Sequence, residues 1–100
     1  MKRGEVTVAN RLGLHARPSA ALTHLATRFA ADVFLSKGSR RVNGKSIMGV
    51  MMLAAARGSV IVVETDGNDE DQALEALVAL IASGFGEEPG KPGEGGGTGR

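Results

Sequence analysis

The 100-residue chain has no cysteine, no tryptophan and no tyrosine, and only three phenylalanines. Without cysteine it can form neither a disulfide nor a thiolate metal site. Its longest mostly apolar run, residues 47–56, is far shorter than the roughly 18 residues that a membrane span needs. The basic N-terminus passes straight into an alternating strand pattern, without the apolar stretch of a signal peptide. We therefore expect a soluble, cytoplasmic protein that does not enter membranes.

The chain is also short for two domains, since one domain usually takes about 100–200 residues. The last fifteen residues, 86–100, hold seven glycines and two prolines and almost nothing apolar. Such a segment cannot bury enough surface to offset the entropy lost on ordering it. We expect one folded domain over residues 1–85 and a disordered tail over residues 86–100.

The formal net charge of +1 conceals an uneven distribution. Residues 1–58 carry ten Lys or Arg against Glu5 and Asp32, whereas residues 59–85 carry six acids and no base. A chain polarised in this way can be steered towards an acidic partner on its basic side. Nucleic acid would suit the same side, so charge alone does not identify the partner.

Apolar periodicity predicts seven elements. Alternation at Val6 and Val8 indicates a strand over about residues 4–9, and apolar residues at helical spacing indicate a helix over about 16–29. A hairpin turn is expected at Lys37-Gly38. The remaining predicted elements are strands over 32–36 and 40–43, a short helix over 47–56 that stops at Gly58, a strand over 60–65, and a helix over 70–83 with Asp69 as its cap and Gly84 at its end.

The predicted order is thus β-α-β-β-α-β-α. Strands that alternate with helices but include a tight hairpin favour an α+β fold, in which helices cover one face of an antiparallel sheet.

The segment from Asn10 to Ser19, N-R-L-G-L-H-A-R-P-S, places His15 immediately before a predicted helix. Free N–H groups and the helix dipole favour an anion at such a position. The same positive end disfavours a charged imidazole, which leaves a ring nitrogen available as a nucleophile, and Arg17 could contact phosphate oxygens. On spacing alone, however, His15 fits a loop or capping residue at least as well. His24 is expected to be exposed, and two isolated histidines do not make a metal site.

A second segment, from Asn43 to Gly49, reads N-G-K-S-I-M-G. It is not a P-loop, because the upstream glycine that the motif requires is missing. Ser46 is instead well placed to cap the short helix. Ile47, Met48 and Met51 follow, and not all of the apolar residues of this helix can be buried, which makes an exposed docking patch an alternative to a core stripe.

Together these two motifs closely resemble the HPr family of bacterial phosphotransferase systems. N-x-x-G-L-H-A-R-P matches the active-site loop of the family from Asn10 to Pro18, and V-N-G-K-S-I-M-G-V-M matches its regulatory serine segment from Val42 to Met51. The resemblance spans residues 3–85. It implies an open-faced β-sandwich with four antiparallel strands in the order 1-4-2-3 and three helices on one face.

The resemblance also implies a function, with no cofactor and no metal. His15 would accept a phosphoryl group on Nδ1 from enzyme I, which draws it from phosphoenolpyruvate, and would pass it to an enzyme IIA domain. Arg17 would contact the phosphate, and Ser46 would be the target of HPr kinase/phosphorylase. The protein would act as a monomer and as a carrier rather than a self-sufficient enzyme. The residues expected to contact partners are Ile47, Met48, Met51, Ala20 and His24.

Thr27 departs from the family pattern, because many members carry a basic residue there. We expect that contact to be weaker here, with Arg28 or His24 as substitutes. The alternative class is a small α+β RNA-binding or ligand-sensing domain. Such domains usually stack bases on aromatic side chains. This chain has only three, of which Phe29 and Phe34 are expected in the core and Phe85 at the border of the tail, so we expect no nucleic-acid partner.

Overall fold

The computed structural model describes residues 1–86, and its elements follow the predicted order. Of the predicted tail, residues 87–100 lie outside the described residues. The elements are β1 (Lys2–Thr7), α1 (Ala16–Ala26), β2 (Asp32–Lys37), β3 (Arg40–Asn43), α2 (Ile47–Met52), β4 (Val60–Asp66), α3 (Glu70–Ala82) and a final 3-10 turn, η1 (Gly84–Gly86).

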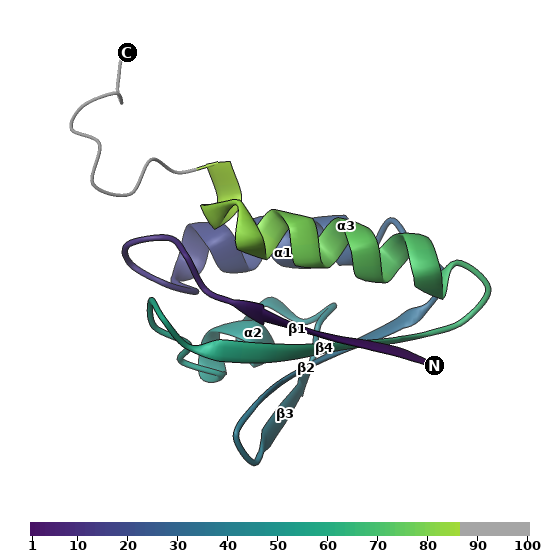
Figure 1. The fold of residues 1–100 in the computed structure, drawn as a ribbon, viewed down its shortest axis with the longest axis horizontal. Helices are drawn as coiled ribbons and strands as arrows, with labels where there is room; N and C mark the ends of the chain where they lie inside the picture. The colour runs from purple at the N-terminus through teal and green to yellow at the C-terminus, as the bar shows by residue number, and fades with distance from the viewer. Residues whose placement is uncertain (87–100) are drawn as a thin grey trace.

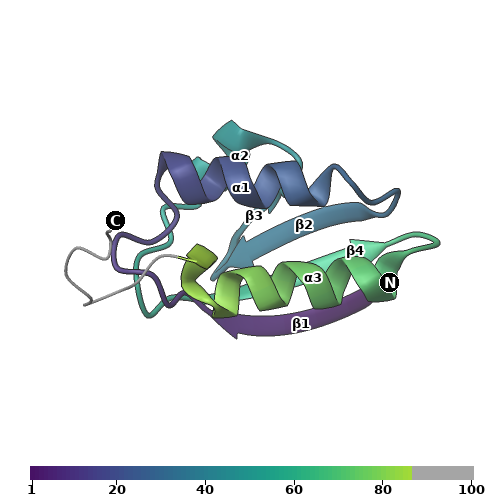
Figure 2. The ribbon, with the colours of Figure 1, turned by 90° about the horizontal axis from the view of Figure 1, so that it is seen from above.

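The four strands form one antiparallel sheet in the order β1-β4-β2-β3. Figure 1 shows α1 and α3 lying over one face of this sheet. Seen from above, α2 lies beside α1 on the side of β2 and β3 (Figure 2). The predicted open-faced β-sandwich and its strand order are confirmed.

The core lies between the sheet and the helices. Side chains alternate between the two faces of a strand, so every second strand residue points at the helices. Burying these side chains supplies the main driving force for folding. The fully buried side chains from the sheet are Val33, Leu35, Ile61 and Val63, and those from the helices are Leu22, Ala26, Val50, Leu77 and Ile81.

Three boundaries differ from the sequence expectation. β1 begins at Lys2, and α1 ends at Ala26 rather than near residue 29. The short helix α2 ends at Met52, well before Gly58. The cause is Ala54, whose φ of 54° is left-handed and ends the helix where glycine would be the usual residue. A glycine-based prediction cannot find such an end.

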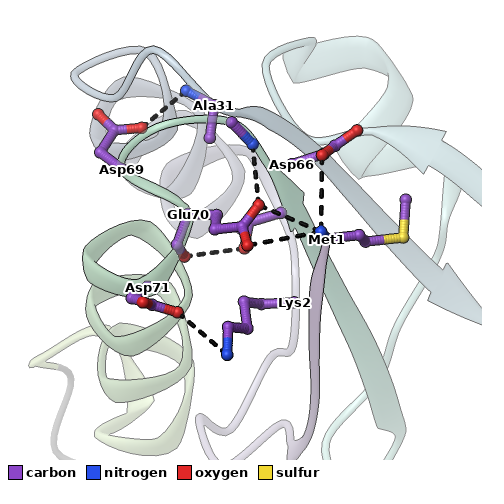
Figure 3. Close-up of polar contacts among 9 residues, drawn as sticks. Met1, Lys2, Ala31, Asp66, Asp69, Glu70 and Asp71 are labelled. Carbon is purple, nitrogen blue, oxygen red and sulfur yellow. Dashed lines mark hydrogen bonds and ion pairs between the residues drawn. The ribbon is translucent and has the colours of Figure 1, made fainter.

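Asp69 has a different role from the one predicted. It stands at the N-cap position of α3, but its side chain makes no capping hydrogen bond. Its carboxylate instead accepts the backbone N–H groups of Ala30 and Ala31, at 2.9 and 2.8 Å. Figure 3 shows Asp69 reaching Ala31 in this way. The predicted cap is therefore wrong, and Asp69 joins α3 to the segment that precedes β2.

The start of β1 is joined to the start of α3 by ion pairs (Figure 3). The amino group of Met1 lies 3.2 Å from Glu70 and 3.6 Å from Asp66. Lys2 lies 3.5 Å from Asp71. Most of these groups are well exposed, so each pair stabilises the fold only slightly.

The phenylalanines also differ from expectation. Phe29 and Phe34 are expected in the core, but both are only half-buried and neither belongs to the core cluster. Phe34 lies between Val33 and Leu35, which face the helices, so its ring is on the open face of the sheet. The guanidinium of Arg41 lies 3.9 Å from the centre of that ring. Phe85, expected at the border of the tail, packs against the core.

Candidate functional site

His15 occupies the N-cap position of α1, as the sequence predicts for a residue just before the helix. Its backbone is extended, with φ −80° and ψ −170°, and its side chain makes no capping hydrogen bond to the helix. The first turn of α1 contains no acidic side chain. The positive end of the helix dipole therefore lies next to a ring that is half-buried and does not cap the helix.

The loop before His15 is fixed by hydrogen bonds around Gly13. The carbonyl of Gly13 accepts the side-chain N–H of Asn10 at 2.7 Å and the backbone N–H of His15 at 2.9 Å. Asn10 is fully buried. Gly13 has φ +69°, and a Cβ atom there would overlap the carbonyl oxygen of Ala55. This position therefore requires glycine, both for its left-handed backbone and for its close approach to Ala55.

Two further contacts hold the loop to the rest of the fold. The N–H of Leu14 donates to the carbonyl of Ala55 at 2.9 Å. Within α1, the hydroxyl of the buried Ser19 donates to the carbonyl of Leu14 at 3.0 Å, and its N–H donates to the carbonyl of His15 at 2.9 Å. The backbone of His15 is thus held by hydrogen bonds on both its N-terminal and its C-terminal side.

Arg17, the second residue of α1, is exposed. Within residues 1–86 its guanidinium forms no ion pair, so its five N–H donors are available to an anion. It lines an open pocket of about 240 Å³ together with Pro18, Ala21 and Phe85. Proline is tolerated in this first turn because the N–H that it lacks would have had no helical partner.

The burial of part of its ring bears on which nitrogen of His15 could carry a phosphoryl group. Nε2 is buried, although the residue as a whole is only half-buried. A bulky phosphoryl group could not attach to a buried nitrogen without displacing its neighbours. The other ring nitrogen, Nδ1, is therefore the better candidate for a covalent adduct.

Ser46 caps α2 as the sequence predicts. Its side-chain oxygen accepts the N–H of Gly49 at 3.1 Å, and its carbonyl accepts the N–H of Val50 at 3.0 Å. Ser46 is half-buried and stands at the N-cap position of a six-residue helix. The hydroxyl of Ser46 thus accepts one hydrogen bond and lies at the edge of the exposed surface of α2.

The apolar residues of α2 divide between core and surface. Val50 alone is fully buried within the helix, while the others are exposed by between 42% and 71%. Leu12, in the loop before His15, is a further exposed apolar residue, with 69% of its surface accessible. The exposed apolar residues of α2 are Ile47, Met48, Met51 and Met52.

The remaining candidates lie on α1, which packs against α2. Ala20 and His24 are both exposed, so both are accessible to a partner. Thr27 follows α1 and donates its hydroxyl to the carbonyl of His24 at 2.8 Å. No cluster of three metal-binding side chains exists among residues 1–86, and no helix in that part of the chain is long and apolar enough to cross a bilayer.

Sequence reasoning did not single out Leu12, Ser19 or the buried amide of Asn10 as separate parts of the site. Asn10 was visible only as a member of a motif, and no pattern marks a buried asparagine in a polar loop. For Leu12 a signal existed, since a leucine in a loop beside a glycine has no helical or strand stripe to join.

Comparison with known proteins places this arrangement in context. The family model described as "PTS HPr component phosphorylation site" matches residues 2–83. The phosphocarrier protein HPr of Cupriavidus necator is 56% identical over 87 residues, which cover 87% of this chain and 98% of that protein.

Solved structures agree with the sequence relatives. HPr-C-His from Thermoanaerobacter tengcongensis matches with a TM-score of 0.85 and 43% identity, over 88% of this chain and 99% of that one. Crh of Bacillus subtilis, described as a dimer with a swapped domain, matches with a TM-score of 0.69 and 43% identity, over 84% of this chain and 97% of that one. Because a relative at this identity forms a dimer, the expectation of a monomer is not confirmed.

Proposed function

Because the chain belongs to the HPr family of phosphotransferase-system phosphocarriers, we propose that His15 is the residue that carries the phosphoryl group. The observation that supports this most is the position of His15. It immediately precedes the first turn of α1, which contains no acidic side chain to oppose an incoming anion. The dipole and free N–H groups of the helix stabilise the negative charge of the transferred group.

In the proposed step the lone pair of Nδ1 attacks the phosphorus of a phosphorylated donor. The new nitrogen–phosphorus bond forms as the bond between phosphorus and the donor breaks, and the donor retains that electron pair. The phosphohistidine then gives the same group to an acceptor by the reverse process. Catalysis of this kind depends mainly on positioning and on stabilising the charge of the equatorial oxygens.

Arg17 is proposed to supply part of that stabilisation. It is exposed and stands in the same first turn of α1 that His15 precedes. A guanidinium can donate two parallel N–H bonds to a phosphoryl group. Arg17 therefore contacts the transferred group without contributing to the stability of the fold.

The proposed partners are enzyme I as donor and enzyme IIA domains as acceptors. The exposed apolar residues of α2 form the centre of the docking surface, and Ala20 and His24 on α1 border it. Exposed methionines adapt to more than one partner. At Thr27, where many relatives have a basic residue, Arg28 or His24 would supply the missing charge.

Ser46 is proposed as a regulatory site for HPr kinase/phosphorylase. A phosphate there would add about −1.5 to −2 charge next to the docking surface. The N-terminus of α2 tolerates such a charge, so the effect would fall on recognition rather than on folding.

We further propose that residues 1–85 suffice for this activity, that the carrier acts as a monomer, and that it works in the cytoplasm, where its phosphoenolpyruvate-dependent donor acts. The last core member is Ile81, and Phe85 packs against the core. A chain truncated after Phe85 that transfers as fast as the full chain, and that sediments as a monomer, would support the first two statements.

The function itself is tested by incubating the protein with enzyme I and phosphoenolpyruvate. We expect one acid-labile, alkali-stable phosphoryl adduct per chain, lost in His15→Ala and retained in His24→Ala. The second histidine, His24, is exposed and serves as the matched control. An adduct that persists in His15→Ala would overturn the assignment of His15.

A further inference from the structure

α2 is too short to be stable by itself. It has six residues and buries only Val50, yet it carries the proposed docking surface. Isolated helices shorter than about 12–15 residues are marginal in water, so the ends of α2 need support from elsewhere in the fold. Ser46 supports its N-terminal end, through the hydrogen bond from Gly49.

The C-terminal end is held by two cations from the β2–β3 hairpin. Arg40, at the start of β3, donates from Nη1 to the carbonyl of Met52 at 2.6 Å. Lys37, at the end of β2, donates from Nζ to the carbonyl of Ala54 at 3.1 Å. Lys37 and Arg40, here called the hairpin cations, pair directly across the hairpin. Positive side chains at this end of a helix satisfy its last carbonyls and complement its dipole.

The carbonyl that Lys37 contacts belongs to a strained residue. Ala54 has a left-handed backbone, with φ 54°, which is costly for any residue other than glycine. Such a conformation persists only where surrounding contacts hold it. The hydrogen bond from Lys37 to the carbonyl of Ala54 is one of those contacts.

The next residue connects this turn to the loop before His15. The carbonyl of Ala55 accepts the N–H of Leu14 at 2.9 Å and lies against Gly13. The carbonyls of Ala54 and Ala55 belong to successive peptide groups of one turn, so the placement of this turn determines where Leu14 is held. An uninterrupted series of contacts runs from the hairpin cations, through the end of α2, to the residue that precedes His15.

We propose that Lys37 and Arg40 are positioning residues for the carrier, which hold α2 and, through Ala54 and Ala55, the loop that carries His15. They touch neither His15 nor the first turn of α1, so their effect is indirect. The structural half of this proposal, that the hairpin cations hold α2 and the loop before His15, rests on the contacts alone. Its consequence for phosphoryl transfer rests on the proposed function.

Amide hydrogen exchange tests the structural half without any phosphoryl donor. The variants are Lys37→Met and Arg40→Met, singly and combined, because methionine keeps the apolar stem and removes only the charge and the donors. Each single change should raise exchange at Leu14, Leu53 and Ala54 about two- to fivefold, the range expected from one charge at a helix end. Exchange at Leu35 and Ile61, in the centre of the sheet, should not change.

The matched control is Arg41→Met. Arg41 follows Arg40 but points to the opposite face of β3, where its guanidinium binds Glu64 at 3.0 Å. This control removes the same charge from the same strand, so it reports any general loss of attraction for an acidic partner. Arg40→Lys and Lys37→Arg keep the charge and should restore exchange at Leu14 to within a factor of about two.

With enzyme I, kcat/KM of Arg40→Met should fall further than that of Arg41→Met at the same salt concentration, and Arg40→Lys should recover most of the loss. The proposal is overturned if amide exchange at Leu14 is no faster in the combined variant than in Arg41→Met. This holds even if exchange at Leu53 rises. If the parent accepts no phosphoryl group at all, the proposed function fails, and the exchange data still decide whether the hairpin cations hold the loop.

Discussion

The N–H of Leu14 donates to the carbonyl of Ala55, and this 2.9 Å hydrogen bond joins the loop before His15 to the turn after α2. Gly13 lies against the same carbonyl, so the two segments approach too closely for a side chain between them. The loop before His15 and the turn that follows the second motif therefore form one unit in the fold. A substitution in either segment should therefore alter the structure of the other.

Gly13→Ala should destabilise the protein more than Gly38→Ala. Both glycines are left-handed, with φ of +69° and +60°, so both substitutions incur about 1–2 kcal/mol of backbone strain. Only at Gly13 would the new methyl group also overlap the carbonyl of Ala55, whereas nothing lies within 4 Å at Gly38. That overlap should add about 1–3 kcal/mol. Urea denaturation measures the difference in the free energy of unfolding. Equal losses for the two variants would show that the loop can move away from Ala55 at no cost.

Much of the fold could be predicted from the sequence because periodicity and local turn chemistry carried it. The strand at Arg40–Asn43 and the helix from Glu70 to Ala82 lie almost where they were expected. The helix end at Ala54 could not be predicted, since its left-handed backbone depends on contacts made by residues far away in the chain. The same is true of Asp69, whose carboxylate bonds to Ala30 and Ala31 instead of its own helix.

Within the site, the positions of His15 and Ser46 at helix starts followed from local sequence. The supports around them did not. The hydrogen bond between Leu14 and Ala55 joins two loops with no shared pattern, and only the fold brings them together. Two motifs could be identified from the sequence, but not the contact between the first motif and the turn that follows the second.

Arg17→Ala should slow phosphoryl transfer and leave the fold unchanged. A charge-assisted hydrogen bond to phosphate contributes about 1.5–3 kcal/mol, which corresponds to a loss of roughly tenfold or more in rate. Because Arg17 is exposed and forms no ion pair within residues 1–86, its removal should leave the melting temperature nearly constant. Rapid-quench kinetics in both directions measure the effect. Arg3→Ala, which removes an exposed charge on β1, is the control. Equal rates for the two variants would assign Arg17 no part in transfer.

Ser46→Asp should slow phosphorylation of His15 by enzyme I, while Ser46→Ala should leave it nearly normal. The new negative charge opposes an acidic partner and the desolvation of the apolar residues that follow it. Added salt should partly restore the rate of the Asp variant, since exposed charges are screened over about 8–10 Å. Steady-state kinetics at low and high salt separate the two effects. Ser46 would be only a helix cap if the Asp variant matched the parent at low salt.

The order of the two Ser46 variants in stability should be the reverse of their order in transfer rate. Ser46→Ala removes the acceptor for the N–H of Gly49 and should cost about 0.5–2 kcal/mol. Aspartate is itself a good N-cap residue, so Ser46→Asp should lose little. The variant with the slower transfer would then be the more stable one, which excludes unfolding as the cause.

Asp69 should make stability fall in acid. The N–H groups of Ala30 and Ala31 bind its carboxylate and hold its pKa below the ordinary value of 3.8. Since the pKa is lower in the folded state, the stabilisation is fully present above the unfolded pKa and is lost as pH falls through the folded pKa. Urea denaturation of the parent and of Asp69→Asn between neutral pH and about pH 3 measures it. The stability of the variant should depend less on pH in the acid range, whereas the exposed Asp32→Asn should behave like the parent. Parallel curves for the parent and Asp69→Asn would contradict the prediction.

The central claim is that one ring nitrogen of His15 carries the phosphoryl group. Imidazole nitrogens can be followed directly by NMR in the protein labelled with ¹⁵N at histidine, before and after phosphorylation by enzyme I and phosphoenolpyruvate. His15 and His24 are the only histidines, so their signals are assigned by single substitutions. We predict a large shift and a phosphorus coupling at Nδ1 of His15, reversed on addition of an enzyme IIA domain, with His24 unchanged. A coupling at Nε2 of His15, or at either nitrogen of His24, would contradict the account.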